Sequence, residues 1–184
     1  MTARNHASSS IASLLAPWLE GRIAGAAELR IDNVVEPRQG QSSETVLFDA
    51  IWRENGKWRE RGLVARIQRR TICPMLADVM FQHDVMEAIA IHSETAVPAI
   101  AFSEPDGDVI GQPFFLMEWL KGRVPSDFPL FHAEGWVVDL AVTERTRLWW
   151  NAICEMTKLH RIDAENFAFI GDATGEPGSR FYLA

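Results

Sequence analysis

The sequence predicts an α+β protein with a mostly antiparallel, five-stranded sheet, and three observations support this class. Three apolar segments follow one another between residues 28 and 68, and a helical period then precedes two further apolar segments. Asn55-Gly56, the strongest short signal for a β-hairpin, joins the second segment to the third. A doubly wound parallel sheet would instead alternate strands and helices regularly.

Each predicted element rests on a local signal. Ser10 can cap a helix that ends at Leu19, although Pro17 counts against it, and residues 1–9 are expected to form a frayed terminus. A second helix is expected over 77–93, where apolar residues recur with helical spacing. Alternating or continuous apolar residues predict five strands over 28–35, 46–52, 58–68, 96–102 and 114–120.

The last third of the chain is predicted to be loop-rich and then helical. Thr143 is expected to cap a long helix that ends near Leu159, with Glu144 in its first turn, as the helix dipole prefers. The residues from Glu104 to Asp108 predict a turn between the last two strands, and the sequence becomes turn-like after Asp163.

Composition indicates a globular protein and limits its partners. The 184 residues are 47% apolar and 23% charged, and the net charge of −7 argues against nucleic acid or an acidic membrane as the main partner. Cys73 and Cys154 lack the paired spacing of a disulfide framework or a zinc site. No signal peptide and no apolar run of membrane-spanning length is found, so we expect a cytoplasmic protein without a membrane partner.

A candidate phosphate-binding loop joins the first two strands. Gly40, Gln41, Ser42 and Ser43 are small or polar, and a glycine lets backbone N–H groups approach phosphate oxygens closely. No Gly-Lys-Ser/Thr follows, so the segment is not a Walker loop. The alternative is a plain hairpin loop.

Arg66 is the candidate phosphate-binding cation, because it follows Val64-Ala65 on the third strand. Arginine can contact phosphate oxygens at two points and keeps its charge. The alternative is a solvent-facing arginine at a strand edge. Gln82 and Glu87 on the next helix are the two candidates for orienting Arg66, and Gln82 would replace the usual ion pair by a neutral hydrogen bond.

Met117, Glu118 and Trp119 are the candidate adenine-binding residues. They end an apolar, aromatic strand, and from Met117 onward the backbone could pair with the adenine edge while side chains flank the ring. The alternative is a strand that only contributes to the core.

As a set, several motifs resemble the aminoglycoside phosphotransferase and choline kinase-like family. They include Gly40-Gln41-Ser42, Val64-Ala65-Arg66, Val97-Pro98, the run from Gly111 to Glu118, and Gly122-Arg123. The resemblance implies a protein kinase-like N-terminal lobe for nucleotide over residues 1–120, and the start of a C-terminal lobe over 121–184. It also implies ATP and Mg²⁺ as cofactors, and transfer of phosphate to the hydroxyl of a small molecule that the sequence does not identify.

The catalytic loop of that family, His-Gly-Asp-x-x-x-x-Asn, does not occur in the 184 residues. Asp172 lacks a preceding histidine, and Asp163 is followed by Asn166 at the wrong spacing, so both are interpreted as loop residues. We therefore expect no catalytic residue and no metal ligand in this chain, which resembles a family member truncated near its middle and inactive alone.

Two further hypotheses stay open. The chain could be a non-catalytic, kinase-like module that binds nucleotide or a partner protein. Trp149-Trp150, two of seven tryptophans, would leave apolar surface exposed if the second lobe is absent, which predicts self-association or instability. The last hypothesis is a small α+β domain with no nucleotide role, which substitution of Arg66 and Gly40 would affect only in stability.

Overall fold

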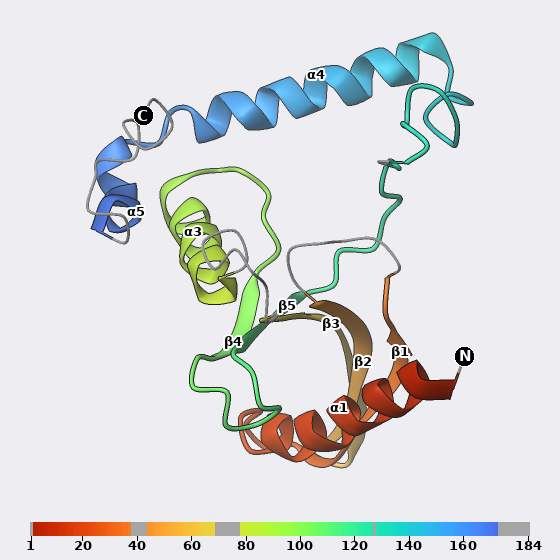
Figure 1. Ribbon diagram of the computed structural model, residues 1–184, viewed down its shortest axis with the longest axis vertical. Coiled ribbons are helices and arrows are strands. Elements are labelled where there is room, and N and C mark those ends of the chain that lie inside the picture. The colour runs from red at the N-terminus through yellow and green to blue at the C-terminus, as the bar shows by residue number, and fades with distance from the viewer. Residues whose placement is uncertain (1, 38–43, 69–77, 127, 173–184) are drawn as a thin grey trace. The chain divides into compact units, whose positions relative to one another are not determined.

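The computed structural model describes residues 2–37, 44–68, 78–126 and 128–172, and it confirms the predicted fold class. Five antiparallel strands form one sheet in the order β1-β2-β3-β5-β4 (Figure 1). The strands are β1 (Ala27–Val35), β2 (Glu44–Glu54), β3 (Lys57–Ile67), β4 (Ile100–Glu104) and β5 (Phe114–Glu118).

The turn between β2 and β3 fixes the register of the central hairpin. Asn55 and Gly56 both have positive φ angles, 49° and 77°, as a two-residue type I′ turn requires. Glu54 and Lys57 therefore pair directly, and the pairing continues without a bulge to Glu44 and Ile67. Every side chain of this hairpin is thereby assigned to one of the two sheet faces.

Helix α1 (Thr2–Glu20) covers one face of the sheet (Figure 1). Leu15 and Leu19 are almost fully buried there, at 1% and 0% exposure. They pack with alternate residues of three strands: Val46, Phe48, Ala50, Leu63, Ala65, Ile67, Phe114 and Leu116. This apolar cluster is the core that holds the sheet in place.

The prediction that α1 begins at Ser10 was wrong, because the helix begins at Thr2. The small and polar residues before Ser10 make no apolar stripe, but several of them are compatible with helical backbone. Pro17 lies in the last turn of the helix, where its missing N–H interrupts only the end of the hydrogen-bond ladder.

Helix α3 (Val79–His92) begins at a polar cap. The Asp78 carboxylate accepts hydrogen bonds from the backbone N–H groups of Met80 and Phe81, at 2.9 and 3.1 Å. The Gln68 side chain, directly after β3, accepts the N–H of Val79 at 2.7 Å. The start of α3 is therefore tied to the end of β3.

Strands β4 and β5 are displaced from their predicted bounds. β4 begins at Ile100 and not at Ala96, since Pro98 has no N–H to donate to a ladder. It continues through Glu104, predicted as the first turn residue, whose buried carboxylate accepts the N–H groups of Asp106 and Gly107. β5 ends at Glu118, two residues earlier than predicted.

Helix α4 (Val142–Leu159) begins one residue before its predicted cap. The N-cap is Ala141, and Thr143 lies inside the first turn, so the prediction that Thr143 caps the helix was wrong. The Glu144 carboxylate accepts the N–H of Ala141 at 3.1 Å, while an alanine side chain offers no acceptor in return. A short 3₁₀ helix η1 (Ala164–Phe167) and helix α5 (Ala168–Asp172) follow where turns were predicted.

The chain divides into two compact units. One comprises residues 1–86 and 98–119, and the other comprises residues 87–97 and 120–184. The division places the end of α3 and the loop after it with the second unit, whereas the sequence predicted a single boundary near residue 120. Among the residues that the structure describes, no helix combines the length and apolar character that crossing a bilayer would require.

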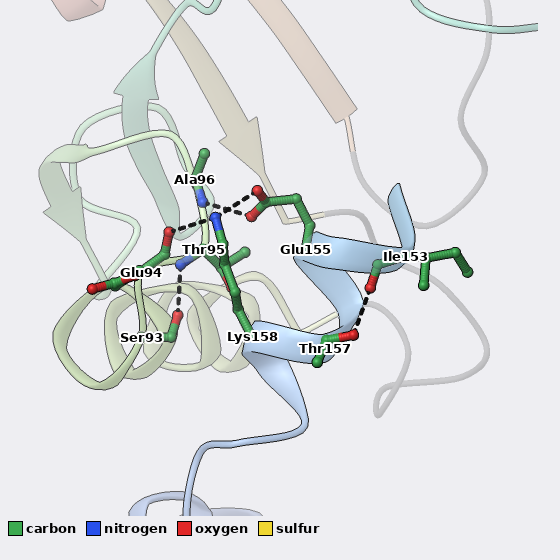
Figure 2. A network of polar contacts seen from close by, with 8 residues as sticks. All are labelled: Ser93, Glu94, Thr95, Ala96, Ile153, Glu155, Thr157 and Lys158. Carbon is green, nitrogen blue, oxygen red and sulfur yellow. Dashed lines mark hydrogen bonds and ion pairs between the residues drawn. The ribbon is translucent and has the colours of Figure 1, made fainter. Parts of the chain in front are cut away.

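Within the second unit, an exposed polar network ties the loop after α3 to α4 (Figure 2). The Glu155 carboxylate accepts hydrogen bonds from the backbone N–H of Ala96 and from the Lys158 ammonium, at 3.3 and 2.7 Å. Lys158 also donates to the carbonyl of Glu94 at 3.4 Å. We call Glu155, Lys158 and these two backbone groups the loop clamp.

Candidate functional site

The sheet face away from α1 carries three rows of side chains across β2, β3 and β5. The hairpin register and the pairing of β3 with β5 define the rows. The first row is Thr45, Arg66 and Phe115; the second is Leu47, Val64 and Met117; the third is Asp49, Gly62 and Trp119. Successive rows lie about 7 Å apart, since each strand residue advances about 3.4 Å.

Arg66 is the cation of the first row and is fixed from two sides. Its Nη1 donates to Thr45 Oγ1 at 2.8 Å, and its Nη2 donates to Gln82 Oε1 at 2.9 Å. β3 lies between β2 and β5, so Arg66 is half-buried on an inner strand and not at a sheet edge. Burial lowers the pKa of Arg66, because desolvation penalises its charged form, although an arginine remains protonated at neutral pH.

Gln82 is the candidate partner that the structure brings to Arg66. α3 presents Gln82 to the first row, and the next residue, His83, meets the Phe115 ring edge-on with centroids 5.7 Å apart. The other candidate, Glu87, is an exposed residue further along the same helix. In the part of the chain that the structure describes, no ion pair to a carboxylate is found for Arg66.

The second row is apolar. Val64 is 7% exposed, and Leu47 and Met117 are half-buried on either side of it. An apolar surface of this kind, flanked by a cation, matches the two ends of a nucleotide: a flat purine and a polyanionic tail.

In the third row, the Trp119 side chain packs against Gly62. A Cβ added at Gly62 would lie 3.3 Å from Trp119 Cβ and Cε3, so the indole rests on the bare glycine backbone. The neighbouring Asp49 carboxylate is 7% exposed and accepts a hydrogen bond from Asn33 Nδ2 at 2.8 Å. Asn33 reaches it from an irregular stretch of β1, where its φ angle is +53°.

The backbone N–H groups of Glu118 and Trp119 already have partners. They donate to the carbonyls of Ala99 and Gly62, at 2.9 and 3.0 Å. The Glu118 side chain also has a partner, since Arg61 Nε donates to it at 2.8 Å. A ligand at this strand end would therefore meet carbonyl oxygens, each of which can accept a second hydrogen bond.

Several predicted site residues lie outside this geometry. Gly40, Gln41, Ser42 and Ser43 lie outside the described residues. Asp163 precedes η1 as its N-cap, and its carbonyl accepts the N–H of Asn166 at 3.0 Å, which agrees with its interpretation as a loop residue. The same interpretation was wrong for Asp172, which is the last residue of helix α5.

The Mg²⁺ that the sequence resemblance implies has no binding site in the described part of the chain. No group of three or more His, Cys, Asp or Glu side chains there could bind a metal ion. The described residues therefore do not fit a Mg²⁺ held by the protein alone.

A separate hollow of about 430 Å³ lies within the second unit. Its walls are mainly apolar, with Phe131, Leu148 and Trp149 among them, and His132 and Arg145 supply polar groups. Of the residues that the sequence singled out for nucleotide, none in the described part of the chain lines this hollow.

Sequence reasoning missed Thr45, although a signal for it exists. Thr45 and Arg66 each lie nine residues from the pair Glu54–Lys57 that closes the Asn55-Gly56 turn. Counting outward from that turn places the hydroxyl opposite the guanidinium. Asn33, by contrast, reaches Asp49 only because β1 is irregular there, and no sequence pattern predicts that irregularity.

Comparison with known proteins now identifies the class. The model of the phosphotransferase enzyme family (APH) matches residues 33–180, which is most of the chain. The chain therefore belongs to this family.

A solved structure also resembles the chain. It is the crystal structure of a "putative aminoglycoside phosphotransferase" from Ralstonia eutropha JMP134, with 25% sequence identity and a TM-score of 0.43. The match covers 64% of this chain and 30% of the other, so the matched region corresponds to less than a third of that protein.

Proposed function

We propose that this chain is the nucleotide-binding part of an ATP-dependent phosphotransferase that acts on a hydroxyl group of a small molecule. Family membership supports phosphotransferase chemistry in general. The observation that carries the nucleotide assignment is Arg66, a fixed cation in the row beside an apolar surface on the same sheet face.

In this proposal the purine lies against Leu47, Val64 and Met117, and the phosphates extend toward Arg66. The adenine amino group donates to a backbone carbonyl at the end of β5, because the Glu118 and Trp119 N–H groups are used within the sheet. Trp119 borders the purine, and Gly40–Ser43 covers the phosphates. Gln82 orients Arg66 in place of a carboxylate.

The chain is proposed to bind nucleotide without transferring phosphate. Phosphoryl transfer depends on positioning the acceptor and on stabilising charge, and the family's catalytic aspartate motif is absent from these 184 residues. Mg²⁺ would arrive as the counter-ion of ATP.

Calorimetric titration of ATP into the purified chain tests the assignment, with Arg66→Met as the key variant. We expect ATP to bind the wild type and to bind Arg66→Met at least about tenfold more weakly, since a hydrogen bond to a charged group is lost. Arg59→Met is the matched control, because Arg59 lies on the same strand in an exposed pair with Glu54. Equal ATP affinity of all three proteins would refute the proposal.

The second candidate is a non-catalytic module that binds nucleotide or a partner protein. The same missing motif favours it. One experiment distinguishes the two candidates. Addition of a polypeptide that carries the catalytic loop would produce phosphate transfer if the chain is part of a phosphotransferase, and would not if it is a non-catalytic module.

A further inference from the structure

Arg66 is held in an unusual way for a phosphate-binding cation, by two neutral oxygens on two different elements. Thr45 Oγ1 on β2 accepts from Nη1, and Gln82 Oε1 on α3 accepts from Nη2. A guanidinium has five N–H donors, and these two bonds use two of them. The bonds fix the plane of the group without neutralising its charge.

We propose that Thr45 is a positioning residue of the nucleotide site, which with Gln82 keeps the charge of Arg66 available to a bound polyphosphate. The inference rests on the proposed nucleotide-binding function and extends it to a residue and a role. Thr45 would act only through Arg66 and would not touch the reacting atoms.

A neutral partner of Arg66 and a carboxylate partner would affect a bound phosphate differently. A carboxylate beside Arg66 would form an ion pair that a phosphate has to compete with, and it would repel the phosphate directly. A hydroxyl and an amide do neither. The cost is a desolvated cation that has no carboxylate partner among the described residues, and the desolvation agrees with the lowered pKa of the half-buried Arg66.

Thr45 and Gln82 contribute differently to this arrangement. Thr45 lies directly opposite Arg66 in the β2–β3 ladder, so its position is set by the hairpin itself. Gln82 depends on the placement of α3, whose start is tied to β3 through Gln68 and Val79. The hydrogen bond to Thr45 therefore holds the Arg66 guanidinium to the sheet, and the one to Gln82 holds it to helix α3.

The test measures ATP and adenosine affinities of the full 184-residue chain by calorimetry. Thr45→Val keeps the shape and removes the acceptor, and we expect it to weaken ATP binding about three- to tenfold while leaving adenosine unchanged. Thr45→Ser keeps a hydroxyl and should restore the ATP affinity. A purely structural role of Thr45 would weaken both ligands together.

Gln82→Glu is the second variant, and it tests the role of neutrality. We expect about tenfold weaker ATP binding at low salt, a smaller loss at high salt and unchanged adenosine binding. Tighter ATP binding by Gln82→Glu would overturn the argument. Because this variant keeps the side-chain shape, it tests the role of neutral partners even if Thr45→Val unfolds.

The possible failures are distinguishable. If the wild type binds no ATP, the proposed function falls and this inference falls with it. If the wild type binds ATP and Arg66→Met weakens it, but Thr45→Val binds both ligands as the wild type does, only the role of Thr45 is refuted. Failure of Thr45→Ser to restore binding would also refute that role.

Discussion

Gly62 shows how much of the candidate site depends on single residues. Gly62 is the residue that β3 contributes to the third row, and a Cβ added there would lie only 3.3 Å from Trp119 Cβ and Cε3. Glycine is needed at this position because the Trp119 side chain approaches the backbone closely, and not because the backbone has a positive φ angle. Trp119 is thereby fixed beside the apolar second row, where a purine is proposed to lie.

Gly62→Ala is predicted to damage both stability and purine binding. Its new methyl group would lie 3.3 Å from Trp119 Cβ and Cε3, so Trp119 would have to move by a few tenths of an ångström, and its Cβ is held by the backbone. We expect a loss of about 1–3 kcal/mol in the free energy of unfolding and weaker adenosine binding. Urea unfolding and calorimetry check the two effects.

Gly21→Ala is the control for this substitution. A Cβ at Gly21 would make only ordinary contacts, the nearest at 3.7 Å. It should change neither the free energy of unfolding by more than about 0.5 kcal/mol nor the adenosine affinity. If Gly62→Ala behaves like Gly21→Ala, the described packing of Trp119 is unimportant for the site.

The residues of the site differ in how far sequence could predict them. Arg66 was predicted from its place after Val64-Ala65, and Gln82 from its place on the next helix. The structure joins the two side chains by a hydrogen bond. The choice between Gln82 and Glu87 required the rotation of α3 about its axis, which depends on packing with Phe115 and is not encoded in local spacing. The hydrogen bond from the exposed Asn33 to the buried Asp49 required a strand irregularity and was not predictable.

At the scale of elements, α1 is predicted to stabilise the sheet that carries the site. Leu19→Ala removes a fully buried side chain at the core, and we expect a cost of about 2–5 kcal/mol in the free energy of unfolding. Leu14→Ala, on the same helix but 47% exposed, should cost much less. Urea unfolding with an unchanged m-value measures both, and equal costs would contradict the assigned core.

The loop clamp is predicted to depend on pH. Its hydrogen bond from Lys158 lowers the pKa of Glu155 below the ordinary 4.5, and the same bond raises the pKa of Lys158 above the ordinary 10.5. The Glu155 contribution to stability is complete above pH 4.5 and is lost as the pH falls through its lowered pKa. The Lys158 contribution is complete below pH 10.5 and is lost as the pH rises through its raised pKa.

Hydrogen exchange at the Ala96 amide measures the clamp directly. We expect protection of this amide between these two limits, reduced protection in Glu155→Gln, and a dependence on salt because the pair is exposed. Arg147→Gln, also on α4, serves as the control. Unchanged exchange of the Ala96 amide in Glu155→Gln would show that the clamp does not form in solution.

Element types were predictable and element ends were less so. The hairpin followed from Asn55-Gly56, and its observed turn has the expected positive φ angles. The errors at the starts of α1 and α4 share a cause: a polar residue that can cap a helix can also lie within one, as Ser10 does in α1 and Thr143 does in the first turn of α4. Pro98 could have corrected the start of β4, because a residue without an N–H cannot pair there.

At the scale of the whole molecule, apolar surface on α4 predicts self-association. None of its residues is buried, and Trp149 and Trp150 are 63% and 59% exposed. Sedimentation velocity should show an average mass that rises with protein concentration, and Trp149→Gln with Trp150→Gln should reduce the rise. Trp58→Gln, another exposed tryptophan on β3, should not. A single monomer at all concentrations would contradict this prediction.

The central claim is that nucleotide binds the sheet face opposite α1. Amide and methyl NMR spectra of the labelled chain, titrated with ATP, test it most directly. We predict shift changes at Leu47, Val64 and Met117 with both adenosine and ATP, and changes at the Arg66 side chain with ATP alone. Shift changes confined to the hollow around Phe131 and Trp149, or no changes at all, would contradict the account.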